Sequence, residues 1–428
     1  MKIAITNGHL IDPRNQINKR CDLFIQDNTV IATEHAPDGF AADKIIDADK
    51  LIVSPGFVDL CARLREPGLE HKGTILSETR AAVASGVTSL CMPPDTTPVL
   101  DTPAVIELIN QRNVDAGFCR VYTLGALTKG LEGEYLSEMA HLKDAGCIGV
   151  SNAMHSIPNP QVLRRAMEYA ASVDMTVFLH PQDKGLANGG CVHEGVVSTR
   201  LGLVGVPEAA ETQAVANFLM LVEQTGVRVH FCRLSTARAV QMIGRAKYDG
   251  LDLTADVAAH QLHLTEMDIG YFNSQCHVQP PLRTQRDCDA LRDAVASSQI
   301  EAICSDHQPH DVDAKLAPFG STEPGISSIE TLFPLSMRLV NDGLLNMTEL
   351  VDRLSTTPAE ILGINAGHLG VGAMADITIF DPGHHWILKT ENLISQGKNT
   401  PFKYWEFQGK IKQTICDGKL VYDAGTTS

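Results

Sequence analysis

Eight short β-rich runs, each followed by a longer segment with helical spacing of apolar residues, occupy the middle of this 428-residue chain. The runs read GFVDLCA, GVTSLCMPP, CRVYTLGAL, GCIGVSN, MTVFLHP, RVHFCRLS, DLTADVAAH and IEAICSDHQPH, and they begin near residues 56, 86, 119, 146, 175, 228, 252 and 300. This alternation is typical of parallel βα units, and eight such units close a barrel. We therefore predict an α/β fold built on a (β/α)8 TIM barrel.

Three of the intervening segments carry clear helix signals, at residues 102–114, 162–172 and 208–225. The last begins with acidic side chains and is followed by Gly226, a typical helix stop. Several strand runs turn polar at their ends, as in LHPQD and SDHQPH. A (β/α)8 barrel places its active site at that end of the strands, so we expect the functional residues there.

Both ends of the chain differ in character from the middle. Residues 1–52 and 366–428 hold short β-like runs separated by Asn-Gly, Asp-Gly and Asp-Pro turns. We expect the two ends to meet in one small β domain beside a barrel that spans residues 53–365.

The charge balance excludes two classes of partner. The formal net charge is −16, and the sequence contains no block of five or six Lys or Arg residues, so we expect binding neither to nucleic acid nor to anionic membranes. The N-terminal MKIAITNGHLIDP resembles no signal or transit peptide, and no apolar run approaches the ~20 residues of a membrane span. We expect a cytoplasmic protein.

The eleven cysteines are scattered singly from Cys21 to Cys416, and no CxxC pair marks a zinc knuckle or a redox dithiol. We expect most of them to be reduced and to behave as small hydrophobic residues.

Seven landmarks in order carry a resemblance to a known family. They are SPGFVD, LREPG, GVTSLCMPP, SDHQPH, EPGISSIET, STTPAEILGI and GVGAMADITIFDP, and together they span nearly the whole chain. The sequence resembles the amidohydrolase superfamily and, within it, the dihydroorotases. That resemblance implies a zinc-bound hydroxide at the barrel mouth and an Asp that shuttles protons.

Most of the metal-ligand positions implied by the resemblance hold unsuitable residues. The first strand of the family ends His-x-His-x-Arg, where this chain has Cys61, Arg63 and Arg65. Asn152 and Ala153 stand where the fourth strand should offer a carboxylate, and Arg233 stands where the sixth should offer His. Only two ligand positions are retained, His180 and Asp306. We therefore expect no catalytic metal and read Asp306 as a vestige of the active site.

The two arginines at ligand positions decide this interpretation. A guanidinium group stays protonated and has no acceptor, so Arg63 and Arg233 cannot bind a cation. They supply charge of the same sign as the missing metal, and we expect them to hold Asp306 through bidentate hydrogen bonds. The hypothesis is that an ion-pair cluster replaces the metal site.

The positions that the resemblance assigns to substrate binding are also altered. The resemblance assigns Arg65 and His310 to substrate contacts, but the two expected asparagines are replaced by Pro94 and Gln279. Arg65 and His310 would suit a substrate-like pocket. Equally, Arg65 could pair with Glu66 or Asp95, and His310 could cap a loop.

Other candidate residues have plain structural interpretations. Cys61, His180 and Asp306 are acceptable zinc ligands, so a reduced site with one zinc is the alternative to no cofactor. The His307 and His310 pair has a spacing that is weak evidence for a metal on a loop. We expect two further features to be structural, with His260 and His263 on the surface or in a loop, and Tyr404-Trp405 packed between the β domain and the barrel.

Three functions follow from the resemblance. The sequence resembles in particular the inactive dihydroorotase homologues that assemble with bacterial aspartate carbamoyltransferase, and that resemblance implies a homodimer within a larger hetero-oligomer and a scaffolding role. The stretches KGTILSETRAAVASGVTSLC, KLAPFGSTEPGISS and HVQPPLRT support that subgroup. The alternatives are an amidohydrolase that opens a cyclic amide with an altered metal site, and a ligand sensor that uses Arg65.

Overall fold

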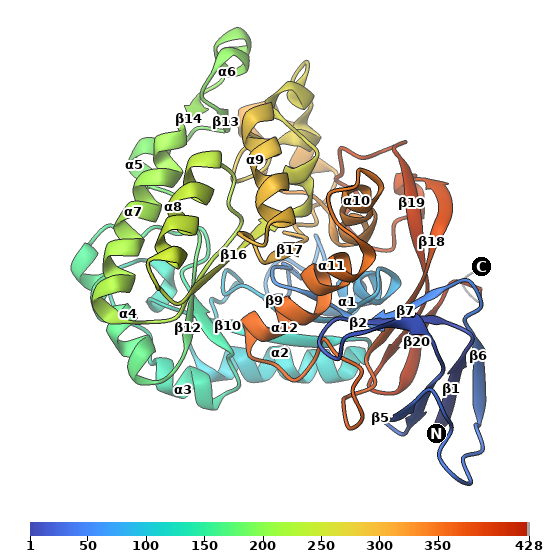
Figure 1. Cartoon of the computed structure of the whole chain (residues 1–428). Helices are drawn as coiled ribbons and strands as arrows, with labels where there is room; N and C mark the ends of the chain where they lie inside the picture. The colour runs from blue at the N-terminus through green and yellow to red at the C-terminus, as the bar shows by residue number, and fades with distance from the viewer. Residues whose placement is uncertain (426–428) are drawn as a thin grey trace.

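The computed structural model describes residues 1–425 and contains the predicted barrel (Figure 1). Eight parallel strands follow the order β8-β9-β10-β11-β12-β15-β16-β17. They are β8 Phe57–Asp59, β9 Val87–Met92, β10 Arg120–Ala126, β11 Gly149–Ser151, β12 Thr176–Leu179, β15 Val229–Phe231, β16 Leu253–Ala258 and β17 Ala302–Cys304. Every predicted β-run contains one of these strands, so the fold class is confirmed.

The barrel closes between the extensions of its first and last strands. A parallel bridge joins Ala62 to His307, the Arg63 backbone amide donates to the His307 carbonyl at 2.9 Å, and the His307 amide donates to the Cys61 carbonyl at 3.2 Å. The segments that follow β8 and β17 therefore lie side by side at the mouth of the barrel.

One larger helix follows each barrel strand, and these helices surround the sheet (Figure 1). They are α1 Ile75–Ala84, α2 Pro103–Ala116, α3 Met139–Asp144, α4 Pro160–Ser172, α7 Glu208–Thr225, α8 Ala237–Tyr248, α9 Gln285–Ala296 and α10 Ile329–Asn341. The three predicted helices correspond to α2, α4 and α7. Helix α7 ends at Gly226, whose φ of 66° is a left-handed conformation that glycine adopts without strain.

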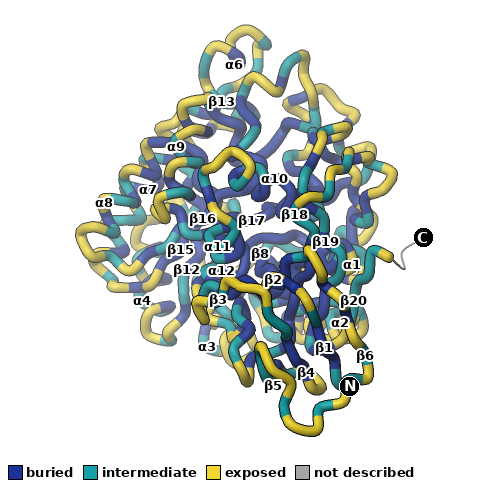
Figure 2. The backbone as a smooth tube through the Cα atoms, turned by 45° about the vertical axis from the view of Figure 1, so that its right-hand side comes forward, coloured by how far each residue is buried: buried dark blue, intermediate teal, exposed yellow. Residues whose placement is uncertain are grey.

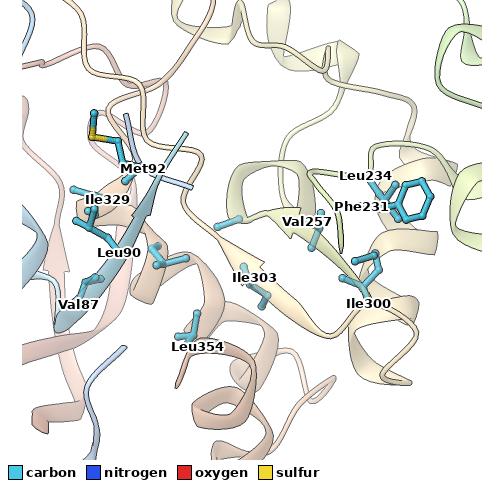
Figure 3. Close-up of a cluster of buried hydrophobic side chains, with 14 of the residues drawn as sticks. Val87, Leu90, Met92, Phe231, Leu234, Val257, Ile300, Ile303, Ile329 and Leu354 are labelled. Carbon is cyan, nitrogen blue, oxygen red and sulfur yellow. The ribbon is translucent and has the colours of Figure 1, made fainter. Parts of the chain in front are cut away.

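The core has two layers around the sheet. Side chains on the outer face of the strands pack against the helices, and Figure 3 shows part of this layer, including Leu90 and Ile303. Alternate strand residues such as Val58 point inward and pack with Phe178 and Cys304 inside the barrel. Helix α12 (Thr357–Leu362) adds Ile361 to this inner cluster, and it follows α11 (Met347–Val351) and a π-helical turn (Asp352–Thr356).

Both ends of the chain build the β domain. A four-stranded sheet has the order β5-β4-β1-β6 and a six-stranded sheet the order β20-β19-β18-β7-β2-β3. The strands are β1 Lys2–Thr6, β2 His9–Asp12, β3 Ile17–Arg20, β4 Leu23–Gln26, β5 Thr29–Thr33, β6 Lys44–Asp47, β7 Ile52–Pro55, β18 Ile377–Ile387, β19 Glu406–Cys416 and β20 Lys419–Asp423. Strand β7 pairs with β2 on one side and with β18 on the other, which joins the two ends in one sheet.

The expectation for Tyr404-Trp405 is half right. The Trp405 ring stacks edge-on against Phe402 at 5.0 Å between centroids, and the Arg338 guanidinium of α10 lies over it at 5.2 Å. Tyr404, in contrast, is exposed, because the chain turns outward there with a positive φ of 65°.

The loop after β12 projects from the barrel as an arm, visible around α6 in Figure 1. It contains α5 Lys184–Ala187, β13 Val192–His193, α6 Val196–Leu201 and β14 Gly205–Val206, and β13 pairs with β14. Short 3-10 turns occupy other loops, at Lys129–Leu131, Ala259–Leu262, Glu266–Ile269, Ser274–Cys276, Asp313–Lys315, Phe319–Ser321 and Thr390–Asn392.

Among residues 1–425, no helix is both long and apolar enough to cross a bilayer. All eleven cysteines are unbridged, and nine are buried.

Candidate functional site

The ends of the barrel strands bring four of the predicted site residues together. Cys61 and Arg63 follow β8, Arg233 follows β15 and Asp306 follows β17. All four side chains are buried, with at most 5% of their surface exposed. Because the carboxyl ends of parallel strands meet at one end of a barrel, residues far apart in sequence share this small space.

Two guanidinium groups flank one oxygen of the retained carboxylate. Asp306 Oδ1 lies 3.2 Å from Nη1 of Arg63, which donates to it, and 3.4 Å from Nε of Arg233. The other oxygen, Oδ2, accepts a hydrogen bond from Gln308 Nε2 at 3.2 Å. The expected bidentate hydrogen bonds are wrong, because both arginines approach the same oxygen and Gln308 occupies the second. The expected ion-pair cluster itself is present.

The ion pairs determine the charge of Asp306. Burial opposes ionisation, but Arg233 and Arg63 outweigh it and hold the pKa of this carboxyl below the usual aspartate value. At neutral pH the cluster therefore contains an ionised carboxylate between two cations.

Asp95 supplies the second negative charge. Its Oδ2 accepts a hydrogen bond from Arg63 Nε at 2.8 Å, whereas the sequence offered Asp95 as a possible partner of Arg65. Burial opposes the ionisation of Asp95 as well, but Arg63 lowers its pKa. Two guanidinium groups and two carboxylates thus balance inside the mouth. The position of Asp95 just after β9 is the sequence signal for this contact.

Cys61 completes the cluster as a neutral thiol. Arg233 Nη1 lies 3.0 Å from the Cys61 sulfur, and the thiol faces Asp306 Oδ1 at 3.6 Å. Burial raises the pKa of Cys61 to about 12, although Arg233 and Arg63 pull it down. Metal ligation requires a thiolate, so the neutral thiol here acts instead as a hydrogen-bond partner of the arginine and the aspartate.

His180 lies beside the ion pairs, and its ring is in hydrogen-bond contact with the Gln182 side chain. Its Nε2 is 3.2 Å from Gln182 Oε1, which also accepts a hydrogen bond from Gln279 Nε2 at 2.8 Å. Burial and the nearby Arg233 lower the pKa of His180 to about 4. Gln279, one of the replaced asparagine positions, therefore belongs to the surroundings of His180.

The residues after the fourth strand, β11, fix the shape of a loop and provide no metal ligand at the expected position. The Asn152 side chain accepts from Thr128 Oγ1 at 2.7 Å and donates to the His155 carbonyl at 2.9 Å, so it fixes the loop after β11. Ala153 carries only a methyl group at the position of the expected carboxylate.

Four non-glycine residues at the mouth have left-handed backbone conformations, namely Arg65, Ala153, Arg233 and Asp306, with φ values between 48° and 67°. Such conformations are unfavourable and concentrate at functional sites. Asp256 supports one of them, because its Oδ1 accepts a hydrogen bond from the Arg233 backbone amide at 2.5 Å. The mouth thus has strained backbone at Arg65 and at three positions that the resemblance assigns to metal ligands, Ala153, Arg233 and Asp306.

Asp256 belongs to a buried network that the sequence did not reveal. Its Oδ2 lies 3.0 Å from His230 Nε2, and His230 Nδ1 lies 2.8 Å from Thr254 Oγ1. The only available signal was the alternation of inward-facing residues in the runs RVHFC and LTADV. This network positions the Arg233 backbone through the hydrogen bond that Asp256 accepts from its amide.

His260 and His263 lie in the loop after β16, as expected, but neither is an exposed surface residue. His260 is only 1% exposed at the mouth, and within the described chain neither of its ring nitrogens has a hydrogen-bond partner. Burial lowers its pKa to about 4. His263 is partly buried, and its Nε2 contacts the Leu335 carbonyl at 2.8 Å. Both residues are shielded from solvent because β16 runs directly into a turn that folds back over the barrel.

Arg65 and His310 are neighbours whose polar atoms lie in close contact. Arg65 Nη2 lies 3.0 Å from His310 Nε2, and its Nε donates to the Pro309 carbonyl at 3.0 Å. His310 Nε2 also lies 3.0 Å from the Pro324 carbonyl. Burial and the adjacent Arg65 lower the pKa of His310 to about 2. The guanidinium that the resemblance assigns to substrate is thus partly occupied by contacts within the chain.

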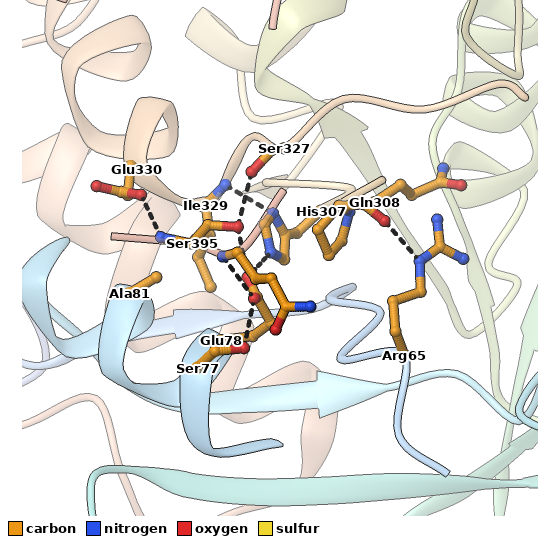
Figure 4. Close-up of polar contacts among 12 residues, drawn as sticks. Arg65, Ser77, Glu78, Ala81, His307, Gln308, Ser327, Ile329, Glu330 and Ser395 are labelled. Carbon is orange, nitrogen blue, oxygen red and sulfur yellow. Dashed lines mark hydrogen bonds and ion pairs between the residues drawn. The ribbon is translucent and has the colours of Figure 1, made fainter. Parts of the chain in front are cut away.

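His307 has a structural role, visible in Figure 4. Its Nδ1 accepts from the backbone amides of Ser328 and Ile329, so Nε2 carries the proton and donates to Glu78 Oε2 at 2.8 Å. Glu78 also accepts from Ser395 Oγ at 2.6 Å. The spacing of His307 and His310 therefore marks two separate contacts. The buried carboxylate of Glu78 fastens the segment that leads to β19 onto the barrel.

The residues present do not fit the family's metal centre. Arg63 and Arg233 hold their positive charges at the carboxylate oxygen where a cation would bind. Among residues 1–425, one group of three ligand-type side chains brings its donor atoms within 4.8 Å of one another, and it consists of His230, Cys232 and Asp256. Cys61, His180 and Asp306 do not form such a group. The His230 ring is already bonded on both sides, so this group is a hydrogen-bond network.

The hollow beside the ion pair of Arg63 and Asp95 is small. A hollow of about 10 Å³ lies between Arg63, Arg65 and Asp95, close to the minimum that holds one water molecule. A larger cavity of about 610 Å³ lies to one side, between His180, the loop after β11, and helices α4 and α7. Its lining does not include Arg65 or Asp306.

Comparison with known proteins identifies the relatives of the chain. A family model described as Dihydro-orotase-like matches residues 49–239. The chain is 51% identical over 422 residues to a dihydroorotase-like protein of Pseudomonas putida and 49% identical over 423 residues to one of Pseudomonas aeruginosa, with at least 99% of each chain covered. It is 39% identical to a dihydroorotase of Geobacter sp. over 428 residues, which cover 99% of this chain and all of that protein. In fold it is similar to the L-hydantoinase of Arthrobacter aurescens, with a TM-score of 0.89 at 21% identity, covering 98% of this chain and 96% of the other.

Proposed function

This chain belongs to the dihydroorotase-like family of the amidohydrolase superfamily, and from that premise we propose that it is a non-catalytic subunit of pyrimidine biosynthesis that scaffolds aspartate carbamoyltransferase. Two relatives whose sequences are 51% and 49% identical to this chain are named dihydroorotase-like protein. That name states the likeness to the enzyme and assigns no reaction.

The contact of Arg63 and Arg233 with Asp306 carries the proposal. A zinc hydroxide needs neutral or anionic ligands around an open coordination position. Here two permanently charged cations flank the retained carboxylate, at 3.2 and 3.4 Å. A third cation at this place would meet strong repulsion in a buried environment. This cluster supports loss of the metal-dependent hydrolysis.

The scaffolding role is inferred from what the chain retains. Barrel, β domain and the strained backbone at the mouth are all present, so the fold has been kept while the site chemistry has changed. The sequence resemblance to the subgroup that assembles with aspartate carbamoyltransferase supplies the partner. A homodimer that bridges carbamoyltransferase trimers would form a closed, symmetric complex.

One observation favours a second function, an amidohydrolase that acts on a cyclic amide with an altered site. The cavity of about 610 Å³ beside His180 is large enough for a small molecule. Relatives at 39–40% identity are named dihydroorotase.

Zinc content and dihydroorotase turnover of the purified protein separate the two functions. If the chain is a scaffold, we expect less than about half an equivalent of zinc, because most ligand positions cannot coordinate a metal. We also expect no turnover of dihydroorotate. Near-stoichiometric zinc that is lost in His180→Ala, together with turnover, would establish the enzyme instead.

A further inference from the structure

Three loops at the mouth end of the barrel form one continuous surface, which we call the rim surface. It consists of residues 191–206 of the arm, residues 263–277 after β16 and residues 311–324 after β17. All three follow carboxyl ends of barrel strands, so they share one face of the molecule.

Two buried residues tie the three loops together. Arg283 Nη1 lies 3.1 Å from His193 Nδ1 and donates to the Val206 carbonyl at 2.9 Å, while the Arg283 carbonyl accepts from the Glu266 amide at 2.8 Å. His277 connects the second loop to the third, because its Nδ1 lies 2.8 Å from Thr322 Oγ1 and its carbonyl accepts from the Gly325 amide. The rim surface is therefore a braced structure.

Large apolar side chains are concentrated on this surface and point into solvent. Tyr271 is 99% exposed, Val196 80%, Leu316 72% and Met267 61%. The other three are Val204, Phe272 and Val312. Figure 2 shows the tube around α6 mainly in the colours of exposed and partly buried residues. A clustered group of exposed Tyr, Phe, Met and aliphatic side chains is typical of protein interfaces.

The charge of the rim surface is strongly negative. The three segments contain six carboxylates, at Glu194, Glu266, Asp268, Asp311, Asp313 and Glu323, and two cationic side chains, Arg200 and Lys315. Lys315 is buried and its ammonium donates to the Glu323 carbonyl. Asp311, Asp313 and Glu323 also line an open hollow of about 470 Å³. Lys72 lines it as well and pairs with Glu323, so Asp311 and Asp313 are the carboxylates that could receive a basic side chain of the partner.

We propose that the rim surface is the docking site for a partner protein that presents apolar and basic side chains. The apolar residues supply the buried contact, and the carboxylates select a partner of opposite charge. A second copy of this chain fits poorly, because the same acidic surface would meet itself in a two-fold contact on a chain of net charge −16. The inference deepens the proposed function and rests on it, because the partner tested is aspartate carbamoyltransferase.

Binding of the full-length chain to the purified aspartate carbamoyltransferase of the same organism tests this proposal. The double variant Met267→Ser with Tyr271→Ser removes the two apolar side chains without touching the braces. Its matched control is Met220→Ser with Tyr248→Ser, on α7 and α8, where Met220 and Tyr248 are 62% and 83% exposed. Thermal unfolding verifies that both variants fold.

We expect the rim variant to bind at least tenfold more weakly and the control to bind within twofold of the unaltered chain. Glu194→Lys with Asp313→Lys should slow association severalfold and weaken its salt dependence. If the rim variant binds as tightly as the unaltered chain, the rim inference is wrong while the proposed function stands. If the unaltered chain does not bind, both fail. If the rim variant alters only the self-association measured by sedimentation, the occupant is a second copy and the proposal is overturned.

Discussion

The Arg233 guanidinium and the Asp306 carboxylate, from the ends of the sixth and eighth barrel strands, face each other at 3.4 Å between Nε and Oδ1. The family resemblance implies a metal between those two strand ends, and here they meet through opposite charges. The contact lets the barrel mouth stay closed and charge-balanced without an ion, since Arg63 and Asp95 supply the second pair at 2.8 Å.

Asp306→Ala should lower the free energy of unfolding by about 3–5 kcal/mol, because it leaves Arg233 and part of Arg63 as uncompensated buried cations. Asp306 is only 2% exposed, so solvent cannot replace the lost partner. Chemical denaturation measures the change, with Asp313→Ala at an exposed position as the control. An unchanged unfolding midpoint for Asp306→Ala would mean that the ion pairs do not stabilise the fold.

Arg63→His alone should restore neither zinc binding nor dihydroorotase turnover. Arg233 remains on Asp306, and Ala153 offers no ligand, so the ion lacks both charge balance and coordination number. Elemental analysis and a turnover assay on the purified variant check this. Recovery of activity by the single change would show that the other lost ligands are dispensable.

The sequence predicts the barrel because its strands and helices follow strong local patterns. The runs at GVTSLCMPP and DLTADVAAH are short β-rich segments between segments of helical spacing, and helix α7 has the bounds that its acidic start and Gly226 indicate. The Asp306 cluster was also predictable, since the residues that end parallel strands converge whatever their chemistry.

What the sequence could not predict depends on side-chain direction and on loop paths. Arg63 pairs with Asp95, and both arginines approach Oδ1 of Asp306. These contacts depend on the side-chain rotamers in a crowded space. His260 looks like a loop residue in AAHQLH, but the turn after β16 folds it inward. The hydrogen bond from the Arg233 amide to Asp256 stabilises a left-handed backbone conformation at Arg233. No local sequence pattern predicts that conformation.

Buried His260 should make stability fall in acid. Its folded pKa of about 4 lies below the ordinary value of 6.5 because of burial. Between these values the unfolded chain binds more protons, so the free energy of unfolding decreases as pH falls, by up to about 1.4 kcal/mol per pH unit for this one residue. In His260→Leu, denaturation from pH 6.5 to 4.5 should show a correspondingly shallower decline. An identical slope in both proteins would contradict a neutral, buried His260.

Glu78→Ala should detach the segment around Ser395 from the barrel. The carboxylate is fully buried and holds both His307 and Ser395, and its loss leaves their donors without a partner, which costs about 3 kcal/mol. Hydrogen exchange of residues 393–399 should increase, whereas Glu107→Ala, at an exposed position on α2, should leave it unchanged. Equal protection in the two variants would show that Glu78 does not fasten this segment.

The most direct test of the scaffolding role is the size of aspartate carbamoyltransferase measured by sedimentation with and without this chain, with transcarbamoylation followed in the same samples. The account predicts a large complex that contains both proteins, and smaller, less active carbamoyltransferase when this chain is absent. Carbamoyltransferase that keeps its full size and activity without this chain would contradict the proposed function.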